Sequence, residues 1–351
     1  MTESDTALEL MGVPGSPYTR KMLALLRYRR IPYHLLPGSR HLLAADSGRF
    51  RSRPQPKVAL LPTFYLKDET GTERAVCDTT PLIREFEVRY AGRSVIPEHP
   101  ALAFIDYLLE DYADEWLTKP MFHYRWSYAE DISKAGQMLP RWNNTTADEL
   151  QIAQKSRQIS ELQISRLHYV GSSELTRETI EQSFDRLLTL LDKHLQQFPF
   201  LLGNRPAACD FAIYGQLTCL ALFDPTPQQK VIEQAPRVYA WTESMEDLSG
   251  YETLKDDWIK PASLPQTLLA LLQEVGRIYV PYLLANAKSV ANSEQEMVME
   301  LDGKPWRQSP FRYQAKCLQW IRQEFSRLSD GDRNLLENQL HPTAVLDLFS
   351  D

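Results

Sequence analysis

The stretch Ser16-Pro17-Tyr18-Thr19 places three hydroxyl groups at the predicted start of a helix. An apolar run over residues 8–13 precedes it and apolar residues at helical spacing follow it, so we expect a turn between a first strand and a first helix. Ser16 suits the N-cap, and Pro17 suits the first helical position, which needs no backbone N–H. Free N–H groups at a helix start stabilise an anion by roughly 0.3 to 1 kcal/mol. The expected chemistry is stabilisation of an anion, unless Ser16 only caps the helix.

An acidic residue followed by a hydroxyl, Asp78-Thr79, precedes another predicted helix, which Thr80 would cap and Pro81 would begin. A carboxylate such as Asp78 can hold an ammonium group. The Thr79 hydroxyl and the N–H groups of a helix start can hold a carboxylate. The alternative is a plain helix start that binds no ligand.

The tetrad at 16–19 resembles the Cys-Pro-Tyr-Cys turn of glutaredoxins with both thiols replaced by hydroxyls. A hydroxyl pair cannot exchange disulfides, so the thiolate that this turn stabilises has to come from another molecule. With Leu61-Pro62 and Asp78-Thr79 following in order, residues 7–90 resemble the cytosolic glutathione transferase superfamily. The turn Gly203-Asn204-Arg205-Pro206, with Asp210 behind it, resembles the start of a helix in the second domain of that superfamily, where the aspartate is structural.

This resemblance implies an α/β thioredoxin-like N-terminal domain followed by an all-α domain of the glutathione transferase type. We expect the first domain over residues 1–92 and the helical domain over residues 98–262. Residues 265–351 exceed an ordinary transferase and are expected to form an atypical, mainly helical C-terminal extension with a possible small hairpin around Asp302-Gly303. Within the extension, Pro281 should kink or end a helix over residues 268–279.

The resemblance also implies roles for the site residues. Ser16 would be the catalytic donor to the glutathione sulfur, and Tyr18 or Thr19 would replace it as thiol donor if the turn is rotated. Pro62 interrupts the apolar run over residues 58–66, and the resemblance implies a cis bond at this proline, just before the third strand. Glutathione would be bound by Ser16, Leu61, Pro62, Asp78 and Thr79.

Two further groups of residues have both a structural and a functional interpretation. A basic segment opposes only one acid, Asp46, and is either a solvated loop or the region that meets the glycine carboxylate of glutathione. It contains Arg40, Arg49, Arg51, Arg53 and Lys57. An aromatic segment of the helical domain is either core or part of the electrophile pocket. The candidate pocket residues are Tyr112, Trp116, Tyr124 and Trp126, and Trp142 follows soon after.

Composition limits the remaining possibilities. The 351 residues carry a formal charge of −7, which argues against nucleic acid as a partner. No apolar stretch approaches the roughly 18 residues of a membrane span, and the polar residues 1–6 are unlike a signal peptide. The four cysteines form no CxxC pair and no metal-like cluster, so we expect free thiols in a reducing cytoplasm and no metal.

The sequence therefore predicts a cytoplasmic glutathione transferase-like enzyme, a homodimer active in detoxification. Its co-substrate would be glutathione and its second substrate a small hydrophobic electrophile, with no nucleic acid or membrane as partner. The alternative is a non-catalytic glutathione-fold protein that binds a ligand or serves in assembly. Disulfide reductase activity is disfavoured because the 16–19 turn contains no cysteine.

Overall fold

The N-terminal part of the chain forms a small mixed sheet, described in a computed structural model that covers residues 7–37 and 53–350. The strand order is β2-β1-β3-β4, with β2 parallel to β1, β3 antiparallel to β1 and β4 antiparallel to β3. The strands are β1 (Leu8–Gly12), β2 (Tyr33–Pro37), β3 (Thr63–Lys67) and β4 (Glu73–Val76). Within the apolar run over residues 58–66, strand β3 begins directly after Pro62, in agreement with the expectation that this proline precedes the third strand.

Two helices of this domain begin at the predicted site residues. Helix α1 (Pro17–Tyr28) follows β1 and is buried along most of its length. Helix α3 (Thr79–Arg89) packs against the sheet through an edge contact of Phe86 with Phe64 at 5.4 Å between ring centroids. It begins at Thr79 rather than after Thr80, so Asp78 occupies the N-cap position that was predicted for Thr80.

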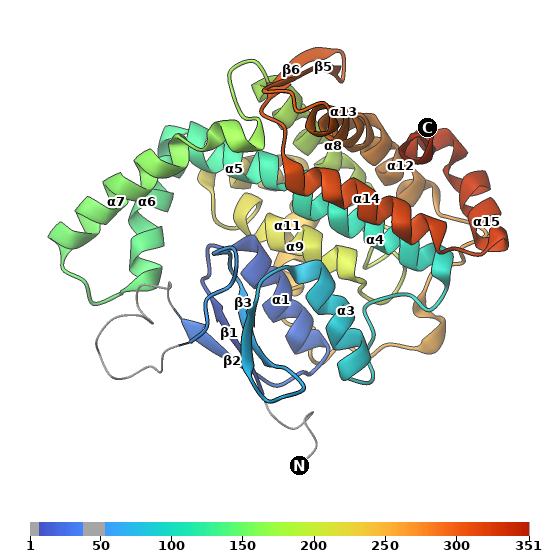
Figure 1. Cartoon of the computed structure of the whole chain (residues 1–351), viewed down its shortest axis with the longest axis horizontal. Coiled ribbons are helices and arrows are strands. Elements are labelled where there is room, and N and C mark those ends of the chain that lie inside the picture. The colour runs from blue at the N-terminus through green and yellow to red at the C-terminus, as the bar shows by residue number, and fades with distance from the viewer. Residues whose placement is uncertain (1–6, 38–52, 351) are drawn as a thin grey trace.

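A bundle of helices follows the sheet domain (Figure 1). Its elements are α4 (Pro100–Glu115), α5 (Thr118–Ser127), α6 (Ala129–Asn143), α7 (Glu149–Ile164), η2 (Leu167–Val170), α8 (Arg177–Leu195), α9 (Ala208–Leu220), α10 (Pro225–Gln234), α11 (Pro236–Ser244) and η3 (Lys255–Asp257). Helix α9 is buried throughout. Its Asp210 accepts the N–H groups of Leu201 and Ala207, each at 2.9 Å, which agrees with a structural role for this aspartate.

The sheet domain meets the bundle where α1 packs on α9. At Gly215 the two backbones approach so closely that an added Cβ would lie 2.6 Å from the carbonyl oxygen of Pro17. Such a distance is too short for a non-bonded contact, so a side chain at residue 215 would push the first turn of α1 away. Glycine at this position therefore sets the spacing between the two domains.

The last part of the chain is the expected helical extension with a hairpin. Its elements are α12 (Gln266–Glu274), η4 (Val275–Tyr279), α13 (Val280–Ala291), β5 (Met297–Leu301), β6 (Lys304–Gln308), α14 (Arg312–Ser326), α15 (Asp330–Leu340), η5 (His341–Thr343) and η6 (Val345–Phe349). Strands β5 and β6 pair antiparallel on either side of Asp302-Gly303. In Figure 1, α14 lies along α4 and next to the sheet domain.

One helical run of the extension differs from the expectation. Residues 266–291 continue through a π-helical turn at η4, and Pro281 lies in the first turn of α13 instead of ending the helix. By length and composition this run could cross a membrane, contrary to the sequence estimate, but most of its apolar window is buried inside the fold. We interpret it as a core helix of the extension.

Candidate functional site

Ser16 lies at the N-cap of α1 and joins the helix to the loop before β3. Its Oγ accepts a hydrogen bond from the Thr19 N–H at 3.2 Å and donates one to the Leu61 carbonyl at 3.3 Å. The Leu61-Pro62 bond is cis, as predicted. The hydroxyl is only half-buried, so a small rotation would turn its proton from Leu61 toward a ligand in front of the helix.

The two alternative thiol donors point into the protein. Tyr18 donates its hydroxyl to the Asp114 carbonyl at 2.7 Å. Burial, together with the charges of Glu115 and Asp114, raises the Tyr18 pKa well above its usual value of 10. Thr19 is fully buried, next to the backbone of Gly12. A role for either residue in activating a thiol requires a rotation of the turn and stays a prediction.

Asp78 and Thr79 lie side by side at the start of α3, and both have partners that the sequence did not reveal. The Asp78 Oδ2 accepts the hydroxyl of Tyr313, from the C-terminal extension, at 3.0 Å. The Thr79 Oγ1 accepts a hydrogen bond from Lys21 Nζ at 3.1 Å. Burial raises the Asp78 pKa, although the Tyr313 hydroxyl and the Lys21 charge act in the opposite direction.

Lys21 is the centre of a buried ionic cluster beneath these two residues. Its Nζ lies 2.7 Å from Glu110 Oε1 and 2.6 Å from Asp114 Oδ2, and the lysine side chain is only 1% exposed. Burial alone would lower the Lys21 pKa, but the two carboxylates raise it overall. One ammonium cannot neutralise two carboxylates, so burial and the Glu110 charge raise the Asp114 pKa to about 6 despite Lys21.

Helix α4 presents further carboxylates on the same side. Burial raises the pKa of Asp111 to about 7 and that of Glu115 to about 8, and neighbouring acids add to both shifts. The second oxygen of Asp114, Oδ1, has no hydrogen-bond partner among the described residues. The region behind Asp78 and Thr79 therefore holds several buried carboxyl groups, and a cation placed beside them would favour their ionised form. The run of acids between apolar residues over 110–115 was a sequence signal for this cluster that we did not use.

The turn before Ser16 is held by the helical domain. Arg125 donates to the Gly15 carbonyl at 3.2 Å and is itself fixed by Asp224, whose two carboxylate oxygens each lie 3.0 Å from Arg125 Nε. The Trp142 ring lies so close to Gly15 that an added Cβ would be 2.2 Å from it. Trp142, which the sequence analysis did not select as a site residue, thus stands beside the helix tip.

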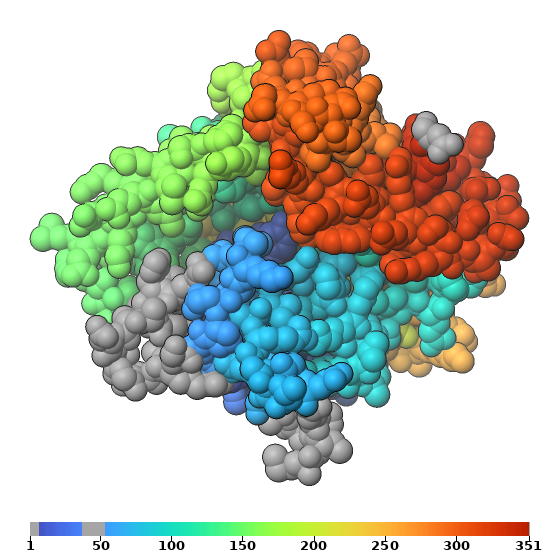
Figure 2. Space-filling view, viewed as in Figure 1, coloured from blue at the N-terminus to red at the C-terminus, as the bar shows by residue number. Residues whose placement is uncertain are grey.

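Figure 2 shows a hollow between α6–α7, the sheet domain and the extension, with early residues of the chain at its floor.

The four aromatic residues expected in the electrophile pocket are core residues here. Tyr112, Trp116, Tyr124 and Trp126 are 2%, 0%, 1% and 2% exposed. Trp116 lies between the helical domain and the extension, against the rings of Tyr282 and Trp306. Rings buried to this degree would have to be uncovered to contact a substrate, so their place in a pocket stays a prediction.

The basic segment lies only partly within the described residues. Arg40, Arg49 and Arg51, and Asp46 opposite them, are outside those residues. Arg53 pairs with Glu9 at 2.9 Å and with Glu73 at 3.3 Å, which fixes it against the sheet. Lys57 is exposed and is the described residue of this segment that is best placed to meet a ligand in solution.

The two domains match known sequence families. The profile of the glutathione S-transferase N-terminal domain matches residues 10–94, and that of the C-terminal domain matches residues 173–244. The chain belongs to the glutathione transferase superfamily. The fold expected for that superfamily, with a sheet domain, a helical domain and here a helical extension, is therefore confirmed. No curated protein matches the sequence of this superfamily member.

Solved structures similar to this superfamily member have low sequence identity. A GST-like protein from Pseudomonas syringae is 16% identical, and the match covers 68% of this chain and 66% of that protein, with a TM-score of 0.40. A glutathione S-transferase from Methylobacterium radiotolerans, in complex with glutathione sulfonate, is 14% identical over 72% of this chain and 100% of its own, with a TM-score of 0.39. FzlA from C. crescentus is 14% identical over 73% of this chain and 96% of its own, with a TM-score of 0.39.

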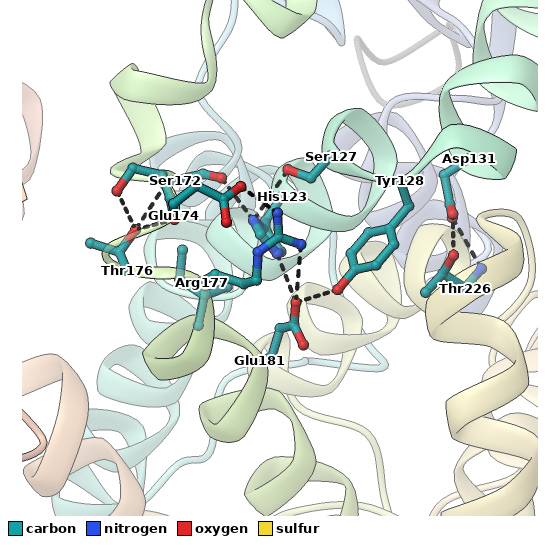
Figure 3. Close-up of polar contacts among 12 residues, drawn as sticks. His123, Ser127, Tyr128, Asp131, Ser172, Glu174, Thr176, Arg177, Glu181 and Thr226 are labelled. Atoms are coloured by element: carbon teal, nitrogen blue, oxygen red, sulfur yellow. Dashed lines mark hydrogen bonds and ion pairs between the residues drawn. The ribbon is translucent and has the colours of Figure 1, made fainter.

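A second polar cluster of this superfamily member resembles the triad of a hydrolase (Figure 3). His123 lies 2.7 Å from Ser172 Oγ through Nδ1 and 3.1 Å from Glu181 Oε1 through Nε2. Ser172 is only 6% exposed and His123 only 1%, and Glu181 is shared with Tyr128 and Arg177. A buried serine whose partners are fully engaged is a poor nucleophile, so we interpret this network as a tie between α5 and α8.

Proposed function

We propose that this protein binds glutathione in front of α1 and activates its thiol for attack on a small hydrophobic electrophile. The observation that carries the proposal is the meeting of Ser16 with the cis Leu61-Pro62 bond at a helix N-terminus, in a domain that matches the superfamily. The Ser16 hydroxyl donates a hydrogen bond to the sulfur, and the helix N-terminus favours its anionic form. Together they lower the pKa of the glutathione thiol below its ordinary value of about 8.5. Each unit by which the pKa falls corresponds to roughly 1.4 kcal/mol of stabilisation of the thiolate relative to the thiol.

The thiol first loses its proton to solvent. With a carbon electrophile the thiolate then forms a carbon–sulfur bond, and the electrophile releases a leaving group or takes up a proton, depending on its class. With an organic peroxide the thiolate instead attacks oxygen, the O–O bond breaks to release an alcohol, and a second glutathione converts the resulting sulfenic acid to the disulfide and water. The remaining glutathione contacts position the peptide without taking part in the chemistry. In this scheme Asp78 meets the γ-glutamyl ammonium, Thr79 with the start of α3 meets the γ-glutamyl carboxylate, and Leu61 meets the peptide backbone.

The second substrate enters from the hollow beside Trp142. That ring stands next to Gly15 and packs on Phe223 with 5.0 Å between ring centroids, so it forms an apolar wall close to the sulfur position. A hydrophobic electrophile would be desolvated against this wall before attack.

We further propose a cytoplasmic homodimer with a detoxifying role. The four cysteines are free in the structure, which supports a reducing compartment.

The test is Ser16→Ala, with Ser326→Ala on the exposed end of α14 as the matched control. Turnover is measured with a panel of aryl halides, epoxides, enones and organic peroxides, and glutathione affinity by calorimetry. Loss of a donor that acts in the transition state should lower turnover about 100-fold while the affinity changes by less than about threefold. Unchanged turnover would reject Ser16, and Tyr18→Phe and Thr19→Ala would then identify the donor.

A non-catalytic role is the second candidate, because the Ser16 proton, the Asp78 carboxylate and the Thr79 hydroxyl all have protein partners in this structure. A ligand carrier or assembly protein of this fold would bind glutathione and turn over none of the panel. Absence of glutathione binding would remove both candidates.

A further inference from the structure

The C-terminal extension contributes a side chain to the predicted glutathione site. Tyr313, in the first turn of α14, extends to the start of α3 and donates its hydroxyl to Asp78 Oδ2 at 3.0 Å. Asp78 and Tyr313 are both half-buried, so the bond lies at the border between protein and solvent. In the sequence these residues are far apart, and only the docking of α14 along α4 brings them together (Figure 1).

Tyr313 is held in place from two sides. Asn286 on α13 forms two hydrogen bonds with the backbone of Phe311, one to its carbonyl at 3.0 Å and one from its N–H at 2.7 Å. Gln314, the neighbour of Tyr313, donates to the Glu115 carbonyl at 3.2 Å and accepts the Tyr282 hydroxyl at 2.6 Å. The first turn of α14 is thus anchored to both the extension and α4, which makes the contact with Asp78 a built feature of the fold.

The charges around Asp78 indicate what it receives. Three carboxylates, those of Asp78, Glu110 and Asp114, face two cations, because Lys21 bonds Glu110 and Asp114 and Arg84 lies 3.7 Å from Glu110. One negative charge is therefore unbalanced, and an ammonium group would neutralise it. The Asp78 carboxylate accepts hydrogen bonds from the Tyr313 hydroxyl and the Thr80 backbone, and since its two oxygens offer about four acceptor positions, it can accept an ammonium group as well.

We propose that Tyr313 is a positioning residue of the glutathione site, whose hydroxyl orients the Asp78 carboxylate to receive the γ-glutamyl ammonium. The C-terminal extension is then a wall of the site and not only a cover of the helical domain. This inference rests on the proposed function. The hydroxyl also favours the ionised carboxylate by hydrogen bonding, so its removal weakens the contact with the ammonium in two ways.

The experiment compares Tyr313→Phe with Tyr251→Phe, whose hydroxyl bonds the Asn204 carbonyl away from the site. Calorimetry on the full chain measures the dissociation constants of glutathione and of its analogue without the γ-glutamyl amino group. Tyr313→Phe should weaken glutathione binding about tenfold and leave the analogue almost unchanged, and Tyr251→Phe should change neither. Where turnover is detected, KM for glutathione should rise with kcat unchanged.

Other outcomes separate the two claims. If the unmodified protein does not bind glutathione, the proposed function fails. If it binds glutathione and Tyr313→Phe binds it equally well, only the role of Tyr313 is overturned. Tighter binding by Tyr313→Phe also overturns it, since the hydroxyl would then be competing with the ammonium. Equal affinity of the unmodified protein for glutathione and the analogue overturns it as well, because Asp78 would not be receiving the amino group.

Discussion

Two lysines, Lys21 and Lys119, are each only 1% exposed and yet have opposite electrostatic environments. Lys21 bonds two carboxylates, which raise its pKa overall. Lys119 bonds the Tyr282 hydroxyl at 3.0 Å, the Val170 carbonyl at 3.1 Å and Gln308 Oε1 at 3.3 Å, all of them neutral. Burial lowers its pKa to about 7, with only the charge of Glu115 opposing the shift.

The comparison shows that burial alone does not determine whether the pKa of a buried lysine is raised or lowered. Together with Asp78, the Lys21 cluster has three carboxylates for two cations, and a ligand at Asp78 would balance it. Around Lys119 the polar atoms are neutral, and the rings of Trp116, Tyr282 and Trp306 surround the ammonium. The first cluster is suited to bind a cation, whereas the second joins the extension to the helical domain.

Lys21→Met is expected to have the largest effect of the changes that test this contrast. It leaves Glu110 and Asp114 buried without their cation, which should lower the free energy of unfolding by about 3 to 5 kcal/mol. Urea unfolding monitored by tryptophan fluorescence measures the change, with the exposed Lys155→Met as control. A loss below about 1 kcal/mol would show that the carboxylates are protonated or solvated without Lys21.

Lys119→Met tests whether the neutral surroundings of Lys119 lower its pKa, through the pH dependence of the free energy of unfolding. Between the folded-state pKa near 7 and the ordinary value of 10.5, the unfolded chain binds the proton that folded Lys119 has lost. The free energy of unfolding of the unmodified protein should therefore rise with pH, by on the order of 2 to 3 kcal/mol between pH 7 and 9 relative to Lys119→Met. Parallel pH profiles for the two proteins would show that Lys119 stays charged when buried.

Gln308→Glu should make the Lys119 cluster more like that of Lys21, with the smallest effect of the three. A carboxylate would then stand where Gln308 Oε1 lies 3.3 Å from the ammonium, at the cost of the bond from Nε2 to the Tyr169 carbonyl. The new charge should raise the Lys119 pKa and reduce the rise in stability between pH 7 and 9 by about 1 kcal/mol. The exposed Gln319→Glu is the control, and an unchanged pH profile would contradict the assignment.

Features set by short-range chemistry could be predicted from the sequence. Ser16 and Pro17 begin a helix and Asp302-Gly303 turns a hairpin, because each depends on a few adjacent residues. The cis bond before Pro62 was expected from the resemblance to the superfamily and not from its neighbours, since only about 5 to 6% of such bonds are cis in general. Pro281 was expected to kink or end its helix, and the helix does not end there, because it continues through the π-helical turn η4, which no local pattern indicates.

The partners of the site residues could not be predicted in this way. Lys21 meets Glu110 across the interface of two domains, and Tyr313 meets Asp78 only after the extension has docked. The acids between apolar residues along α4 were a signal for a buried cluster, but they did not indicate which partners Glu110 and Asp114 would meet. Such contacts depend on how whole elements pack, and sequence periodicity does not describe that packing.

Gly215 allows the first turn of α1 to contact the backbone of α9 directly. Because main chain contacts main chain there, no side chain of residue 215 separates α1 from α9, and the side chains of Arg125 and Trp142 then hold the turn before Ser16. A bulkier residue at this position would push the first turn of α1, and Ser16 with it, away from the helical domain without changing any residue of the predicted site. The position of Ser16 thus depends on a buried residue, Gly215, that has no side chain.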